Sequence, residues 1–192
     1  MVIFKAWQYR ERTRILDDEM RAVASGSAIL FFGDSIAAGF GHPAKLAAVN
    51  RGIGGQTTTD MLMRIDAELG AVRPKEIIIF GGANNLLRDP RDCAEIAATI
   101  TAELRELAEH AVSAGARVHV SSVLPVPGRC AAEVARLNAD LGVAFGVSYL
   151  DLSTIVAAPD GRYRTGLSDD GLHPNAEGYK RIIAAVERAI AQ

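Results

Sequence analysis

The sequence is poor in cysteine and in aromatic residues, with two cysteines, one tryptophan and an aromatic content of 6% among 192 residues. Cys93 and Cys130 stand in neither a Cys-x-x-Cys nor a Cys/His spacing, so nothing supports a structural zinc site. The N-terminus turns charged at once and lacks the apolar core of a signal peptide, which predicts a cytoplasmic protein. Because cytoplasmic thiols are normally reduced, we expect both cysteines to be free.

Long apolar runs and an excess of charge of either sign are also missing. No apolar run approaches the about 18 residues that a membrane-spanning helix needs, so we expect no stable membrane insertion. Lys and Arg number 21 against 23 Asp and Glu, for a net charge of −2, which gives no electrostatic reason to expect nucleic acid as a partner. These absences favour a small, neutral or weakly charged substrate.

The composition that is present is typical of one folded domain. Apolar residues make up 49% of the chain and charged residues 23%, and no repeat or linker divides it, so we expect a single domain over residues 1–192. Residues 5–24 read as an amphipathic helix that precedes the first strand. This helix could serve a dimer contact as well as a core contact, so a homo-oligomer stays open.

Short β-branched or aromatic runs alternate with longer helical patterns along the chain. The run Ile77-Ile78-Ile79-Phe80 is apolar throughout, as a strand covered on both faces requires. The pattern predicts a doubly wound, three-layer α/β/α sandwich with a five-stranded parallel sheet, whose site lies at the carboxyl ends of the strands. The expected strands are 28–32, 48–51, 76–80, 117–122 and 147–150, and the expected helices are 58–69, 91–114, 130–145 and 175–190.

A serine follows the first predicted strand, where Gly33-Asp34-Ser35 forms a sharp turn. A hydroxyl at the carboxyl end of a strand is well placed to be a nucleophile. The alternative is that Asp34 or Ser35 only caps the next helix. The tripeptide alone does not decide between these two interpretations.

A carboxylate and an imidazole stand together near the C-terminus, in Asp170-Gly171-Leu172-His173-Pro174. His173 could accept the proton of Ser35 on one ring nitrogen, while Asp170 on the other nitrogen would fix the tautomer. Asp169 is a weaker candidate for this orienting role. The alternative is a polar loop with a surface histidine.

Two further loops after predicted strands could donate hydrogen bonds to an oxyanion. Residues 50–57 are rich in glycine, including Gly55, and Gly81-Gly82-Ala83-Asn84-Asn85 carries an amide out from the third strand. The alternative for each loop is ordinary turn chemistry. Nucleotide binding has little support, because position 57 lacks the third glycine of a dinucleotide motif and no Gly-Lys-Ser/Thr occurs. The Gly-x-Ser-x-Gly elbow is absent as well.

Taken in order, these segments resemble the SGNH, or GDSL-like, hydrolase family, and the platelet-activating-factor-acetylhydrolase-like branch most of all. The resemblance covers nearly the whole chain. Two departures stand out, since Ile36 replaces the leucine of the family's name and Asn85 stands where many members have aspartate. The matching blocks are Gly33-Asp34-Ser35-Ile36, Gly55, Gly82-Ala83-Asn84 and Asp170-Gly171-Leu172-His173.

The resemblance implies a flavodoxin-like fold and a serine esterase that needs no metal and no cofactor. It implies Ser35 as nucleophile, His173 as base and Asp170 as its orienting acid, with an oxyanion hole from the Ser35 N–H, the Gly55 N–H and the Asn84 side chain. The expected substrate is a small ester with an acetyl or short acyl chain.

Longer acyl chains, as in a lysophospholipase or thioesterase, and a non-catalytic carbohydrate-binding module are the alternatives. No role is assigned to the histidines at positions 42, 110 and 119, although the first could line the pocket. Asp34 is expected to support its turn and not to take part in the chemistry.

Overall fold

The computed structural model of the chain describes residues 29–41 and 48–191. These residues form a five-stranded parallel sheet with the strand order β2-β1-β3-β4-β5, which confirms the predicted flavodoxin-like arrangement. Gly33 at the end of β1 pairs with Gly52 of β2 and with Phe80 of β3, so the three strands end level. The strands are β1 (Ile29–Gly33), β2 (Ala48–Gly52), β3 (Glu76–Phe80), β4 (Arg117–Ser121) and β5 (Tyr149–Leu150).

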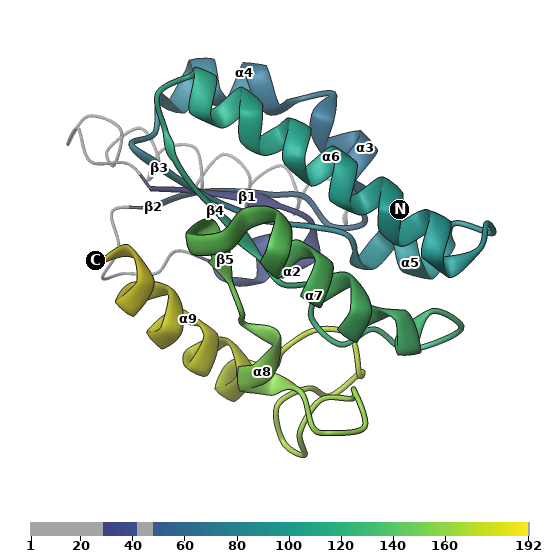
Figure 1. The fold of residues 1–192 in the computed structure, drawn as a ribbon. Helices are drawn as coiled ribbons and strands as arrows, with labels where there is room; N and C mark the ends of the chain where they lie inside the picture. Colours follow the sequence, from purple (N-terminus) through teal and green to yellow (C-terminus); the bar gives the residue numbers. More distant parts are fainter. Residues whose placement is uncertain (1–28, 42–47, 192) are drawn as a thin grey trace, which may run out of the picture.

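Helices cover both faces of this sheet, as Figure 1 shows with α3, α4 and α6 above the strands and α8 and α9 below them. Alternate strand residues point to opposite faces, so Ile77 and Ile79 join one buried cluster while Ile78 and Phe80 join the other. The helices are α2 (Ser35–Gly39), α3 (Thr58–Leu62), α4 (Ile65–Val72), α5 (Ala83–Arg88), α6 (Cys93–Ser113), α7 (Val134–Phe145), α8 (Ser153–Val156) and α9 (Ala176–Ile190), with 3-10 turns at Ala131–Glu133 and Gly146–Ser148.

The predicted helices are observed with two differences, since the segment 130–145 begins with a 3-10 turn before α7 and another helix is interrupted. The strand predicted over 147–150 is shorter, because Gly146–Ser148 forms a 3-10 turn. The segment 58–69 is not one helix but two, because the backbone leaves helical geometry at Arg64, which has φ −128° and ψ −8°. The break coincides with an inward turn of the Arg64 side chain, which packs beneath the first strand. The short helices α2, α5 and α8 have too few residues to show a hydrophobic period, so the sequence pattern did not predict them.

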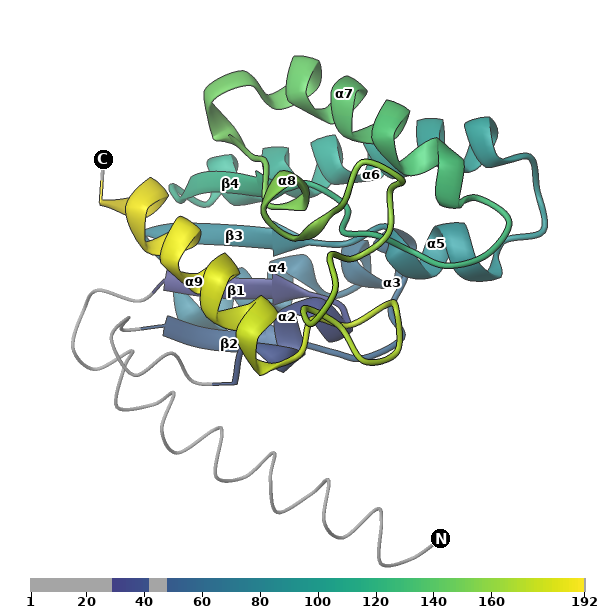
Figure 2. The same ribbon diagram turned by 90° about the horizontal axis from the view of Figure 1, so that it is seen from below.

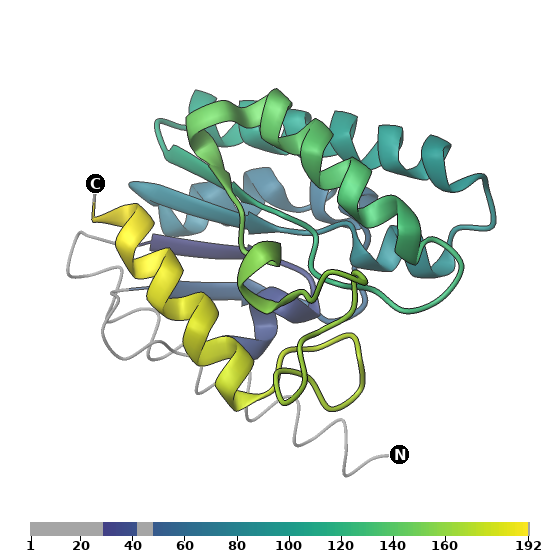
Figure 3. The same ribbon diagram turned by 60° about the horizontal axis from the view of Figure 1, so that its bottom comes forward.

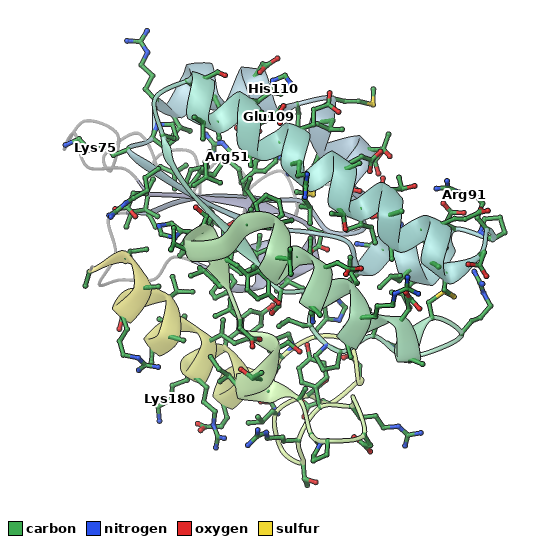
Figure 4. The ribbon with its side chains drawn as sticks, viewed as in Figure 1. Arg51, Lys75, Arg91, Glu109, His110 and Lys180 are labelled. Atoms are coloured by element: carbon green, nitrogen blue, oxygen red, sulfur yellow. A yellow bond between two sulfur atoms is a disulfide. The ribbon has the colours of Figure 1, made fainter. Side chains whose placement is uncertain are left out.

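The expectation that both cysteines are free is wrong. Cys93 and Cys130 form a disulfide with a Cα–Cα distance of 5.5 Å, and the described residues hold no free cysteine. The fold brings the first residue of α6 against the segment that leads into α7, and Figure 4 labels Arg91 at this end of α6. The expectation rested on compartment alone, whereas pairing depends on Cα separation, which a sequence spacing of 37 does not reveal.

Two predictions fall on residues outside the described ones, namely the helix over 5–24 and the pocket-lining His42. The single domain over 1–192 stays a prediction. Within 29–41 and 48–191, no helix combines the length and apolar character needed to cross a bilayer.

Candidate active site

The turn after β1 presents Ser35 at the carboxyl edge of the sheet. Gly33 is required there, because a Cβ on it would lie 2.0 Å from the backbone oxygen of Phe80, at a φ of +154°. The Asp34 N–H donates to that same oxygen at 3.2 Å, and Asp34 Oδ1 accepts from the Ile36 N–H at 2.9 Å. Asp34 is therefore the N-cap of α2, and Ser35 is the first residue of that helix.

The loop between α8 and α9 lies beside α2, as Figures 2 and 3 both show. It carries His173, whose Nε2 is 2.9 Å from Ser35 Oγ although 138 residues separate the two. His173 Nδ1 is 2.7 Å from Asp170 Oδ2. The structure thus brings together the three residues that the sequence singled out, in the order hydroxyl, imidazole and carboxylate.

Asp170 is held as a carboxylate. Its side-chain hydrogen bond with His173 holds its pKa well below the usual range, with further contributions from the backbone N–H groups of His173 and Leu172 at 2.7 and 2.9 Å. An ionised carboxylate only accepts hydrogen bonds, so Nδ1 of His173 carries the proton in this pair. Nε2 is then left as an acceptor toward the Ser35 hydroxyl, which is the arrangement that a general base requires.

Two tyrosines from different elements hold the site's backbone in place. The Tyr163 hydroxyl donates to the carbonyl of Leu172 at 2.9 Å, next to His173. The Tyr179 hydroxyl donates to the carbonyl of Ile36 at 3.2 Å, next to Ser35. Burial raises the pKa of both tyrosines, so both hydroxyls stay protonated as donors.

Asp34 is buried, with 1% of its surface exposed, and burial raises its pKa to about 6 from an ordinary 3.8. Its carboxyl hydrogen bonds to backbone and not to His173, which fits the expected supporting role. Asp169 accepts from the Asn175 side chain at 3.1 Å, and it is Asp170 that contacts the imidazole.

The two glycine- and asparagine-containing loops lie against each other. Asn84, in the first turn of α5, is 5% exposed, and its Nδ2 donates to the backbone carbonyl of Gln56 at 3.0 Å. The Gly55 carbonyl, just before, accepts from Arg88 at 2.7 Å. Gly55 has a φ of +83°, so the turn chemistry weighed for this loop is present as well. The observed turn geometry thus fits the alternative of ordinary turn chemistry, and the oxyanion hole stays a prediction.

The hydrogen bonds of Asn85 use both the oxygen and the nitrogen of its side-chain amide. Its Oδ1 accepts from the Thr58 N–H at 3.1 Å, and its Nδ2 donates to the Thr58 hydroxyl at 2.9 Å. That hydroxyl gives its own hydrogen to Glu103, so its oxygen needs a donor from the other side. An ionised aspartate could not supply one. The departure from the family pattern therefore matches a local hydrogen-bond network.

The remaining described histidines do not join this site. His110 pairs with Asp66 at 2.6 Å on the exterior, and His119 lies 3.0 Å from Glu76 in the sheet. Across the described ranges, no cluster of three or more His, Cys, Asp or Glu side chains is suited to a metal ion.

Sequence reasoning missed three side chains that brace the loops, Gln56, Arg64 and Asn85. The available signal was weak. An arginine in the middle of an apolar helical pattern, between Met63 and Ile65, marks a place where a charge must find partners inside the fold.

The model of the GDSL-like Lipase/Acylhydrolase family matches residues 31–181. No curated protein matches the chain.

Solved structures show the same fold. A GDSL-like lipase from Bacteroides thetaiotaomicron is similar with a TM-score of 0.77 and 22% identity over 88% of this chain and 89% of that one. An acetyl-xylooligosaccharide esterase from Geobacillus Stearmophilus, in a variant form, gives 0.68 and 18% over 87% and 95%. A protein of Streptococcus pneumonia, provisionally named a platelet activating factor, gives 0.66 and 18% over 97% and 95%. The family match spans most of the sequence, and the chain therefore belongs to the GDSL-like lipase/acylhydrolase family of ester-hydrolysing enzymes.

Proposed function

We propose that the chain hydrolyses short acyl esters through a covalent acyl-enzyme on Ser35. The observation that carries the proposal is the hydrogen-bonded series Ser35 Oγ, His173 Nε2, His173 Nδ1 and Asp170 Oδ2, with distances of 2.9 and 2.7 Å. Ser35 is the nucleophile, His173 the general base and Asp170 the residue that orients and stabilises the imidazolium.

The reaction has two steps, acylation of Ser35 and hydrolysis of the acyl-serine. Ser35 Oγ attacks the ester carbonyl while its proton passes to His173 Nε2, and the tetrahedral oxyanion accepts from the Ser35 N–H, the Gly55 N–H and the Asn84 amide. His173 then returns the proton to the leaving alcohol as the carbon–oxygen bond breaks. Water, deprotonated by His173, attacks the acyl-serine, and the acid leaves with Ser35 reprotonated. The second N–H of Asn84 is available for the oxyanion, because the carbonyl of Gln56 occupies only one.

A groove of about 1000 Å³ beside the site supports a bulky alcohol part in the substrate. Its lining includes Tyr163, Ser168 and Gly171, from the segment that carries the orienting acid and the base. Because the base must protonate the leaving alcohol, that alcohol lies on the side of this segment. Among the described residues that line the groove there is no Leu, Ile, Phe or Met, and much of the rest is alanine, glycine, proline or polar.

Most of the lining is apolar, but polar and charged side chains also line the groove and can hydrogen-bond the hydroxyl groups of a hydroxyl-rich alcohol. These are Ser153, Asp160, Arg162, Arg164, Thr165 and Ser168. An acetylated carbohydrate has both a short acyl group and a bulky alcohol part that is rich in hydroxyl groups. The fold shared with an acetyl-xylooligosaccharide esterase is consistent with this substrate class.

The test is hydrolysis of p-nitrophenyl acetate by the wild type and by Ser35→Ala, with a fluorophosphonate probe as a second measurement. The wild type should turn over the ester and bind the probe covalently at Ser35, whereas Ser35→Ala should do neither while keeping its fold. Full activity in Ser35→Ala would overturn the assignment. An unreactive wild-type serine would favour the non-catalytic binding module instead.

Acyl preference is a separate measurement. With p-nitrophenyl esters of increasing chain length, kcat/KM should be greatest for acetyl or another short chain. A maximum at long chains would favour the lysophospholipase or thioesterase alternative.

A further inference from the structure

The side chain of Arg64 reaches the backbone just before the turn that carries Ser35. It is 14% exposed, and its guanidinium carbon stacks 4.1 Å from the centre of the Phe32 ring in β1. Its Nη2 donates to the carbonyl of Gly33 at 2.9 Å, immediately before the turn that carries Ser35. The same carbonyl also accepts from the Ile53 N–H at 2.9 Å, so Arg64 is one of two donors that hold the start of the nucleophile turn.

A second nitrogen of the same guanidinium reaches the neighbouring loop. Arg64 Nε donates to Gln56 Oε1 at 2.7 Å, and the backbone carbonyl of Gln56 accepts from Asn84 Nδ2 at 3.0 Å. One planar group thus ties the turn of Ser35 to the residue that orients the Asn84 amide. Gly55 precedes Gln56 in the chain, and its own carbonyl accepts from Arg88 at 2.7 Å.

The third nitrogen makes a longer and weaker contact. Nη1 lies 3.4 Å from Glu68 Oε1, and the other oxygen of Glu68 accepts from Arg51 Nε at 2.8 Å. Glu68 contacts neither the turn of Ser35 nor the loop of Gln56 in these pairs. It can therefore be altered without breaking the two contacts that reach the site.

We propose that Arg64 is a positioning residue that sets the three oxyanion donors in register with the nucleophile. The inference rests on the proposed function. Arginine suits the task because its rigid fork directs two donors to two different oxygens, whereas the lysine ammonium is a single centre on a flexible stem. The interruption between α3 and α4 falls at Arg64, where the chain leaves helical geometry.

We expect substitutions of Arg64 to lower kcat and to leave KM nearly unchanged. A donor misplaced by a fraction of an ångström stabilises the oxyanion less but leaves ground-state binding unchanged, so kcat falls and KM does not. By analogy with misplacements of about 1 Å, we expect Arg64→Lys to lower kcat on p-nitrophenyl acetate by about 10- to 100-fold, with KM within about threefold.

The experiment compares Arg64→Lys, Gln56→Leu and the double variant with the matched control Glu68→Gln. Lysine keeps the charge and stem, and Gln56 is only half-buried, so both variants should fold, as thermal unfolding will check. Gln56→Leu should lower kcat as well, and the double variant should lose less than the product of the single losses, because both act through one contact. Glu68→Gln should keep kcat within about twofold.

Chemical rescue separates positioning from a merely structural role. Methylguanidinium added to Arg64→Ala should restore part of kcat, whereas methylammonium at the same concentration should not. The proposal is overturned if Arg64→Lys keeps kcat within threefold, if Glu68→Gln loses as much as Arg64→Lys, or if the single losses multiply. Failure of the proposed function looks different, because the wild type would then be inactive and unlabelled by the fluorophosphonate, or Ser35→Ala would retain activity, whatever the Arg64 variants do.

Discussion

The Cys93–Cys130 disulfide leads to a quantitative prediction for stability. It joins residues 37 apart in sequence and ties the start of α6 to the segment before α7. In the chain-entropy account, closing a loop of this length lowers the entropy of the unfolded chain by about 13 cal/mol/K, or about 4 kcal/mol at 25 °C. Folded domains are stable by only about 5–15 kcal/mol, so this one bond supplies a large part of the total.

Urea unfolding of the wild type and of Cys93→Ala/Cys130→Ala, each with and without dithiothreitol, measures this contribution. Reductant should lower the wild-type free energy of unfolding by about 4 kcal/mol and Tm by about 8–16 °C. The double variant should start near the reduced wild type and should not respond to reductant. A wild-type loss below about 1 kcal/mol, or an equal response from the double variant, would refute the reasoning.

Three further substitutions test the site and its support. Asn84→Ala should lower kcat on p-nitrophenyl acetate by about 10²-fold or more with the fold retained, and an unchanged kcat would remove Asn84 from the oxyanion hole. Asp34 has its folded-state pKa raised to about 6, so the folded state binds the proton more tightly and stability falls as pH rises from about 4 to 6. Asp34→Asn keeps an oxygen for the Ile36 N–H without the charge, so relative to wild type it should gain on the order of 2–3 kcal/mol between pH 4 and 7.5, measured by urea unfolding at both values. If the difference in free energy of unfolding between Asp34→Asn and the wild type were equal at both pH values, the reasoning would be wrong. Gly33→Ala would place a Cβ 2.0 Å from the Phe80 carbonyl, and thermal unfolding should show a loss of more than about 2 kcal/mol; a wild-type Tm would mean that the turn relaxes freely.

The sequence alone predicted the sheet and named the three residues that meet at its edge. The run Ile77-Ile78-Ile79-Phe80 predicts a strand buried on both faces because burial selects apolar side chains residue by residue. Ser35, Asp170 and His173 could be named because each stands in a short motif beside a predicted strand or helix. Parallel strands direct the loops that follow them to one edge of the sheet, and the loop between α8 and α9 brings His173 to this edge, 2.9 Å from Ser35.

Only the tertiary structure decided the contacts between residues that carry no local pattern. The pairing of Cys93 with Cys130 depends on how α6 packs against the segment before α7, and no spacing encodes it. The contacts of Arg64 with Gly33 and Gln56 are not encoded by a spacing either. They require the helical segment 58–69 to break at Arg64, although its apolar spacing continues through that position. Local propensity and burial act on each residue separately, whereas these contacts arise from the relative placement of whole elements, which tertiary packing sets.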